Sequence, residues 1–146
     1  MDINLYFKKL QSTTTKFNIE TKAGLNLKTI IEIENRLKVK LPNDIINFYL
    51  YTNGLEGDNW AFNIIPLPEV EKLKDATGEY LTFAEYMIYS EICGLEIDQA
   101  DRNKYKFFTH KNDKNKNLQF RKYIASSVIE FINFYCDQGT LGVFAD

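Results

Sequence analysis

The stretch LPNDIINFYLYTNG, residues 41–54, decides how the amino-terminal half of the chain folds. Pro42 presets the backbone angle of a first helical turn and lacks only an N–H group that such a turn leaves unpaired. Asp44 places negative charge near the positive end of the helix dipole. Asn53 and Gly54 tolerate the left-handed conformation that closes many helices. The stretch therefore predicts a helix of about three turns with a defined beginning and end.

A second helix is predicted directly before this one, in the segment LNLKTIIEIENRLK. It should end before Leu41, because a residue that precedes proline is pushed out of the helical region. Helical spacing assigns one face of it to Leu27, Ile30, Ile31, Glu34 and Leu37. Further upstream, Asp2 can cap a first helix, and at the other end Ser127 and Glu130 have the spacing of a capping box that begins a last helix.

Between these helices the pattern is typical of strands. WAFNIIPLPEV predicts a strand that ends at Pro66 and a short helix from about Pro68 to Asp75. YLTFAEYMIYSEI and ICGLEID predict further strands, the second bent at Gly94. KYKFFTH and LQFRKYIA flank the polar turn KNDKNKN, which is a hairpin pattern.

This order of elements predicts an α+β fold. We expect a single antiparallel-rich mixed sheet of about four to six strands with helices packed on it and helices at both ends of the chain. The 146 residues suit one domain over 1–146.

Composition favours a folded cytoplasmic protein. Hydrophobic residues make up 45% of the chain and aromatic residues 14%, which is enough apolar area for a core. The amino terminus lacks the pattern of a secretory signal, and no apolar run approaches the ~20 residues of a membrane helix. Cys93 and Cys136 fit no metal or redox spacing, so we expect two buried thiols, with a disulfide between them left open.

Charge is unevenly distributed along the sequence. Residues 56–101 carry eleven acidic side chains against Lys72 and Lys74, whereas residues 102–122 carry eight basic ones against Asp113. Charged faces steer encounters with partners, although each block is equally compatible with a simply solvated face.

The chemistry-bearing residues argue against catalysis. His110 is the only histidine, so it cannot supply the several imidazoles of a usual metal site, and we expect it at the surface end of a strand. The carboxylate pairs Glu69/Glu71 and Glu96/Asp98 are interpreted as a solvated sheet edge. No phosphate loop, nucleophile elbow or metal motif is present. We therefore expect no enzyme activity, no cofactor and no bound metal.

A nucleic-acid interface is also disfavoured. Phe107 and Phe108, with the neighbouring lysines and arginines, resemble a stacking platform for a single strand. A chain with an isoelectric point near 5.5 lacks the dominant positive field that phosphate binding requires. Neither nucleic acid nor membrane is expected as a partner.

The run IIEIENRLKVKLPNDIINFYLYTNG resembles the amino-terminal signature of the SUKH superfamily, which contains fungal cell-wall synthesis regulators and many bacterial immunity proteins. Later segments resemble the rest of the family pattern, so that the likeness covers about residues 24–138. Lys38 stands where the family often has glycine, and Ile45 where it often has an aromatic residue. The matching positions are Glu34, Leu37, Val39, Leu41, Pro42, Asp44, Phe48, Asn53, Gly54, Pro66, Leu67, Ala125, Ser126, Ser127 and Phe131.

The resemblance implies a non-enzymatic binding domain. Its bacterial members look like antidotes that block a co-encoded polymorphic toxin, often a nuclease or deaminase and commonly basic. The acidic block from Glu56 to Asp101 suits such a partner. We expect contact residues in the loop before Trp60 and in the acidic segment after it, namely Glu56, Asp58, Asn59, Trp60, Glu69, Glu71, Asp75 and Glu79.

Three alternatives stay open at this point. Trp60 fits a core position at a strand start as well as an exposed binding anchor. The chain could be a general interaction or regulatory module of the cell-wall regulator type, without a toxin partner. An enzyme or nucleic-acid binder is the third class, and a catalytic requirement for His110 would favour it.

Overall fold

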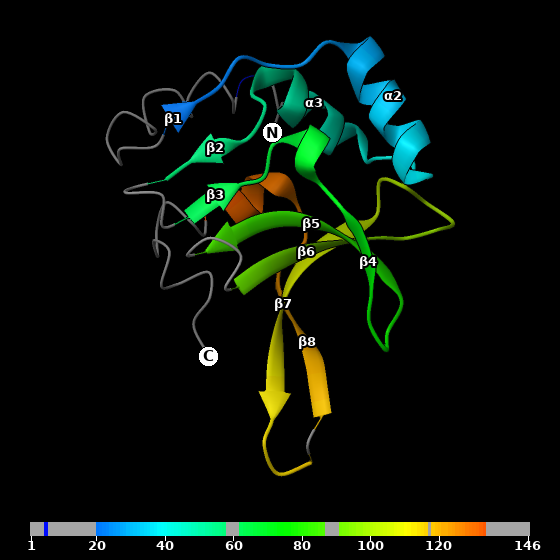
Figure 1. The fold of residues 1–146 in the computed structure, drawn as a ribbon, viewed down its shortest axis with the longest axis vertical. Coiled ribbons are helices and arrows are strands. Elements are labelled where there is room, and N and C mark those ends of the chain that lie inside the picture. The colour runs from blue at the N-terminus through cyan, green and yellow to red at the C-terminus, as the bar shows by residue number, and fades with distance from the viewer. Residues whose placement is uncertain (1–4, 6–19, 58–61, 87–90, 117, 134–146) are drawn as a thin grey trace.

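In the part of the chain that the structure describes, eight antiparallel strands form one sheet, and the helices pack against it (Figure 1). The computed structural model describes residues 5, 20–57, 62–86, 91–116 and 118–133. The strands are β1 (Glu20–Thr21), β2 (Leu55–Glu56), β3 (Phe62–Ile64), β4 (Lys72–Lys74), β5 (Glu79–Tyr86), β6 (Glu91–Ile97), β7 (Tyr105–Asp113) and β8 (Leu118–Ala125). The helices are α2 (Leu27–Leu37), α3 (Asn43–Tyr51) and the 3₁₀ helix η2 (Leu67–Glu69), and residues 128–133 are also helical.

The α+β class is confirmed, but the expected number of strands was too low. The sheet order is β1-β2-β3-β5-β6-β7-β8, with β4 paired to β5, and every pairing is antiparallel. Part of the excess comes from short strands, because β1, β2, β3 and β4 are two or three residues long. Such short strands give a weak period-two signal in the sequence.

The predicted short helix from Pro68 to Asp75 is wrong. Only the 3₁₀ turn of η2 forms, and Lys72–Lys74 then pairs with the first half of β5. β3 pairs with the second half of the same β5 edge, so η2 divides what would otherwise be one long edge strand. The hydroxyl of Thr82 accepts the Glu71 N–H group at 2.9 Å, and Thr82 N–H donates to the Glu71 carbonyl. These two bonds draw the segment into the sheet.

A side-chain hydrogen bond defines the beginning of helix α2, and a left-handed residue defines its end. The Asn26 side chain accepts the Thr29 N–H group at 2.8 Å and caps the amino terminus. The helix stops at Leu37, because Lys38 adopts a left-handed conformation with φ 56° and ψ 47°. Glycine adopts this conformation without steric cost, which explains why glycine suits this position.

The buried face of α2 differs in part from the expected one. Ile33 is buried, whereas Leu27 and Ile31 are 51% and 44% exposed. Glu34 is only 5% exposed, although it is charged. The helix is rotated so that this carboxylate faces inward between its apolar neighbours Ile30 and Leu37.

The inward carboxylate of Glu34 organises the link between α2 and α3. Its Oε2 accepts the backbone N–H group of the fully buried Leu41 at 2.8 Å. The Glu34 carbonyl also accepts the Val39 N–H group at 3.1 Å. The link is thereby held extended into Pro42, which caps α3.

The Asn-Gly pair does not close α3 as predicted. The helix ends at Tyr51, and Thr52 is the cap in an extended conformation. Gly54 has φ 95°, and a Cβ there would lie 2.4 Å from the Ile64 carbonyl oxygen. The Asn53 side chain accepts the Leu67 N–H group at 3.0 Å. The pair therefore serves the turn into β2 and its packing on β3 and η2.

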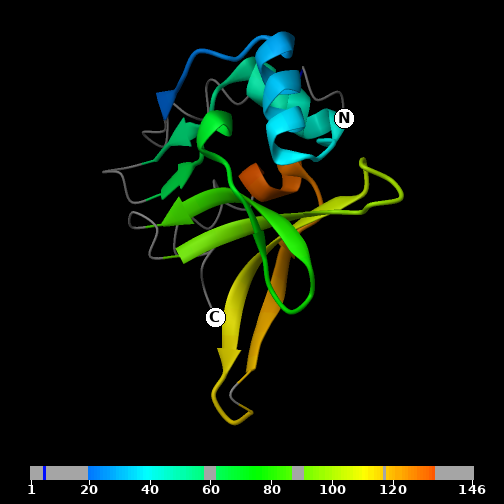
Figure 2. The same cartoon turned by 45° about the vertical axis from the view of Figure 1, so that its right-hand side comes forward.

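Aromatic side chains join the helices to the sheet. Phe83 of β5 contacts Phe48, Phe107 and Phe131, with ring centroids 6.0, 4.6 and 5.4 Å apart. The Tyr49 hydroxyl donates to the buried Ile65 carbonyl at 2.7 Å. These contacts place α3 and the helical segment 128–133 on the same face of the sheet (Figure 2).

The predicted β7–β8 hairpin is confirmed, and its outer half leaves the sheet. β7 pairs with β6 only from Tyr105 to Thr109, whereas its pairing with β8 continues to Asp113. The hairpin therefore projects as a two-stranded arm (Figures 1 and 2).

Helices at both ends of the chain are only partly described. The predicted first helix from Asp2 falls almost entirely outside the described residues. At the other end the Ser127 hydroxyl accepts the Glu130 N–H group at 3.0 Å, as the capping-box spacing predicted. The Tyr105 hydroxyl accepts the Val128 N–H group at 3.0 Å and donates to Asp44, which ties this helix start to α3.

Replacing Lys38 with glycine should stabilise the protein. The substitution relieves the left-handed strain, so we expect Lys38→Gly to raise the free energy of unfolding by about 1 kcal/mol in urea denaturation. Lys40→Gly is the matched control, because Lys40 lies two residues away in the extended link. It should lower the same free energy slightly through unfolded-chain entropy. Equal shifts for both variants would contradict the strain at Lys38.

Removing the Glu34 carboxylate should destabilise the protein strongly. Glu34→Ala leaves the buried Leu41 N–H group without its acceptor, which should lower the free energy of unfolding by about 2–3 kcal/mol. Glu32→Ala on the exposed side of the same helix should change it by less than about 0.5 kcal/mol. A comparable loss in both variants would show that helix propensity rather than the hydrogen bond is responsible.

Candidate functional site

Arg121 of β8 is the centre of a charged cluster on the sheet face opposite α2 and α3. Its side chain is only 3% exposed. Nε and Nη2 donate to the two carboxylate oxygens of Asp75 at 2.7 Å each, while Nη1 donates to Glu96 at 2.6 Å. Nη2 also donates to the Gly78 carbonyl at 2.9 Å. One guanidinium thus fastens the β4–β5 turn to β6 and β8.

The Asp75 carboxylate is strongly stabilised in its charged form. The Arg121 guanidinium holds the pKa of Asp75 far below its usual value, and hydrogen bonds from His110 and from the Thr77 and Gly78 N–H groups act in the same direction. Burial opposes the shift without cancelling it. Asp75 is therefore ionised throughout the neutral range.

Aromatic rings surround the guanidinium. Its Cζ lies 4.3 Å from the centroid of the Phe108 ring and 5.3 Å from that of Tyr80. Phe108 is fully buried, yet it lies apart from the helix-facing core. A Cβ at Gly94 would lie 2.4 Å from this ring. Gly94, predicted as a bend, is required because Phe108 packs directly on the β6 backbone.

His110 belongs to this cluster and not to the surface strand end that we expected. Its side chain is 20% exposed, and Nε2 lies 2.7 Å from Asp75 Oδ2. Tyr80 and Phe108 flank the imidazole, with ring centroids 5.4 and 5.2 Å away. Arg121 binds both oxygens of Asp75, and the His110 imidazole also contacts one of them. Both side chains therefore help to hold the β4–β5 turn against the sheet.

The cysteine that the structure describes is inert in character. Cys93 is fully buried on the helix-facing side of β6, and burial raises the pKa of its thiol. Cys136 and the question of a disulfide lie outside the described residues. Within the described ranges, no group of three or more His, Cys, Asp or Glu residues is placed to hold a metal ion. None of the helices in those same ranges has the length and hydrophobicity of a transmembrane helix.

The predicted contact residues that the structure describes have different surroundings. Asp58, Asn59 and Trp60 fall outside the described residues, so both readings of Trp60 stay predictions. Asp75 is occupied by Arg121 and His110, and Glu79 lies 3.7 Å from the Lys72 ammonium. Glu69 and Glu71 are exposed, and Glu56 lies in β2 with its carboxylate 2.7 Å from Lys22.

Strand pairing does bring other carboxylates together. Register places Glu20 opposite Glu56, Glu56 opposite Asn63, and Asn63 opposite Glu85. Cross-strand partners share a face of the sheet. The neighbouring positions Leu55, Ile64 and Ala84 are buried on the helix side, so this row faces away from the helices. We call Glu20, Glu56 and Glu85 the acidic row.

The Glu85 carboxyl of this row is partly buried and lies near another acidic side chain. Burial raises the pKa of the Glu85 carboxyl, a hydrogen bond from Asn63 opposes the rise, and the charge of Glu69 adds to it. Glu69 of η2 is therefore close enough to interact with the row. Within the part of the chain that the structure describes, Glu85 has no cationic partner, unlike Asp75, and its hydrogen-bond donor is the neutral Asn63 amide at 3.4 Å.

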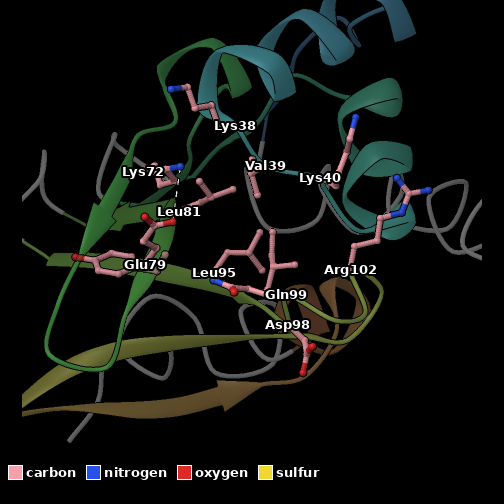
Figure 3. Close-up of a pocket in the computed structure, with 12 residues that line it drawn as sticks. Lys38, Val39, Lys40, Lys72, Glu79, Leu81, Leu95, Asp98, Gln99 and Arg102 are labelled. Carbon is pink, nitrogen blue, oxygen red and sulfur yellow. Dashed lines mark ion pairs between the residues drawn. The ribbon is translucent and has the colours of Figure 1, made fainter.

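A second feature is a pocket of about 290 Å³ between the α2–α3 link and the sheet (Figure 3). Val39 points from the link toward Leu81 of β5 and Leu95 of β6. Charged side chains stand around this apolar floor. They are Lys38, Lys40, Lys72, Glu79, Asp98 and Arg102.

Sequence reasoning missed Arg121, Glu85 and the pocket. Arg121 and Glu85 each sit within a strand pattern as one charge among many, and only the register shows their neighbours. The alternation Lys38-Val39-Lys40 was visible in the sequence and is consistent with an extended segment that has one apolar and one charged side. Nothing in the local pattern indicates that this apolar side faces β5 and β6.

Comparison with known proteins gives one match. The model of the SMI1 / KNR4 family (SUKH-1) matches residues 24–134. No curated protein and no solved structure matches the chain. The match covers both helices, the link between them and the sheet from β2 to β8.

The Asp75–Arg121 contact should make stability depend on acid pH. The folded-state pKa of Asp75 lies below its ordinary value of 3.8, so the stabilisation is complete above about pH 4 and is lost as the pH falls below it. Asp75→Asn should lower the free energy of unfolding by about 3 kcal/mol at pH 7. The difference from the unsubstituted protein should shrink in urea denaturation between pH 4 and pH 2.5. A difference that is constant over this range would contradict the assignment.

Proposed function

This chain belongs to the SMI1 / KNR4 family (SUKH-1), and on that basis we propose that it is an immunity protein that binds and neutralises a cognate bacterial toxin. The family lies within a superfamily of immunity and cell-wall regulator proteins that are generally non-enzymatic. We therefore interpret the surface charges of this chain as parts of a surface that binds another macromolecule. The toxin, its basic character and a cytoplasmic site of action are parts of the proposal.

The acidic row is the observation that carries this proposal. It combines Glu20, Glu56 and Glu85 on one sheet face, with Glu69 close by. Like charges placed directly opposite each other cost free energy in the isolated protein. A basic partner would relieve that repulsion on binding, so the row favours a cationic surface as its counterpart.

Neutralisation by occlusion fits this geometry. A nuclease or deaminase that acts on nucleic acid presents a positive substrate groove, because phosphate binding depends on lysine and arginine. An acidic sheet face could cover such a groove without reproducing the substrate. Complementary fields would also speed complex formation, which matters for an antidote that must intercept a toxin.

The predicted contacts divide accordingly. Glu56, Glu69 and Glu71 stay proposed contacts, because they belong to the row or to the exposed segment beside it. Asp58, Asn59 and Trp60 stay proposed on the sequence argument alone. Arg121 and His110 hold the Asp75 carboxylate, so we assign Asp75 a weaker part in toxin binding. Glu56 and Glu79 each lie beside one lysine, Lys22 and Lys72, with which a basic partner would compete.

Co-expression with the toxin encoded by the adjacent gene tests the proposal. The unsubstituted chain should restore growth and co-purify with the toxin. The triple variant Glu20→Gln, Glu56→Gln, Glu69→Gln should associate about tenfold more slowly at low salt, with a flatter dependence of the rate on ionic strength. Stopped-flow fluorescence measures both quantities.

The matched control removes the same charge elsewhere. Glu32→Gln, Asp101→Asn and Glu130→Gln are exposed positions away from the row, and together they should leave the association rate within about twofold. Equal slowing in both triple variants would show that net charge, not the acidic row, steers the encounter. Absence of growth rescue and of a complex would favour the regulatory module without a toxin partner.

A further inference from the structure

We propose that the pocket beside the α2–α3 link binds the carboxyl-terminal residue of a partner polypeptide when that residue is apolar. The side chain would lie on the floor formed by Val39, Leu81 and Leu95, and the terminal carboxylate would face the basic rim. This site lies apart from the acidic row and does not depend on toxin neutralisation.

The floor provides a surface for one apolar side chain. Leu81 and Leu95 are buried cross-strand partners of β5 and β6, and Val39 faces them from the link (Figure 3). Ile97 extends the same lining. A volume of about 290 Å³ lies at the lower limit of ligand pockets, so it suits a single residue and not a large cofactor.

The rim is positively charged although the whole chain carries a net charge of −2. Four basic side chains surround the pocket against the carboxylates of Glu79 and Asp98. Glu79 is paired with Lys72, and Asp98 accepts the N–H groups of Ala100 and Asp101 through Oδ1. Both carboxylates are therefore engaged within the protein.

The remaining cations favour an anion at the mouth of the pocket. In the part of the chain that the structure describes, Lys38 and Lys40 form no ion pair, and the Arg102 guanidinium donates only to the neutral Asn43 amide oxygen at 3.3 Å. Figure 3 shows Lys38, Lys40 and Arg102 extending outward from the rim while Val39 points inward. A carboxylate at the mouth could therefore be reached by more than one cation.

The apolar floor and the cationic rim are close enough for a single bound residue to contact both. A carboxyl-terminal leucine, methionine or phenylalanine carries an apolar side chain and a carboxylate on the same Cα. A bare inorganic anion would contact the rim but not the apolar lining of the pocket. The pocket wall is also preorganised, because the Glu34–Leu41 hydrogen bond fixes the link that carries Val39.

Peptide binding by the complete chain tests this site. The probe is a fluorescent pentapeptide, GSGSL, with a free terminal carboxylate, and its carboxamide is the matched control. Anisotropy should give at least tenfold tighter binding for the free acid. In ¹⁵N-edited spectra the backbone amide signals of Val39 and Leu95 should shift with the acid. Equal affinity of acid and amide would overturn the proposal.

Two pairs of substitutions distinguish a specific contribution of the rim from a general effect of net charge. Lys40→Gln with Arg102→Gln should weaken binding of the free acid about tenfold, whereas Lys28→Gln with Lys116→Gln should leave it within twofold. Equal weakening in both pairs would overturn the rim assignment.

Two competitors test whether the side chain and the carboxylate of one residue are recognised together. N-acetyl-leucine presents both groups of the peptide terminus, so it should displace the peptide at a concentration similar to that of the unlabelled peptide. Failure of N-acetyl-leucine to displace the peptide would overturn the assignment of the terminal residue to this pocket. Displacement by millimolar inorganic phosphate would show that the rim is a plain anion site and would overturn the proposal. None of these measurements involves the toxin, so their failure leaves the proposed immunity function untouched.

Discussion

A single buried hydrogen bond, from the Leu41 N–H group to the Glu34 carboxylate, governs the geometry of the helical layer. A charged side chain at 5% exposure is costly unless its oxygens are paired, and here its partner is a backbone group seven residues away. The bond obliges the chain to leave α2 at Lys38 and to run extended into Pro42. The axis of α3, the position of Val39 over the sheet and the burial of Leu41 all follow from that path.

The same constraint connects the recognisable sequence with the surface features. The acidic residue in the helix and the Leu-Pro pair that mark the family are the two ends of this hydrogen-bonded link. Between them, Lys38, Val39 and Lys40 form one wall of the pocket. Residues that look like helix signals in the sequence therefore also form the hydrogen bond that fixes the link between the two helices. The pocket results from the extended path that this hydrogen bond imposes on the link.

On the opposite face of the sheet, the charge blocks of the sequence fold against each other. The acidic segment supplies β5 and β6, and the basic segment supplies β7 and β8, which follow them in the sheet. Arg121 consequently meets Asp75 and Glu96, and Lys106 lies 3.6 Å from Glu96. Charged side chains of the acidic and basic segments therefore pair with each other within the protein. The acidic row persists because β1, β2 and β3 lie on the far side of β5, away from the basic hairpin.

Local sequence determined the elements that local forces decide. Pro42, the capping residue Ser127 and the alternating pattern of the β7–β8 hairpin could be recognised in the sequence because each acts on neighbours within a few residues. The two-residue strands, the rotation of α2 toward Ile33, and the roles of Gly54 and Gly94 were not, because each depends on a contact with a distant segment. The charged surfaces belong to this second group. Side-chain charge can be read from the sequence. Strand register, which only the tertiary structure decides, determines that Asp75 meets a cation whereas Glu85 meets none among the described residues.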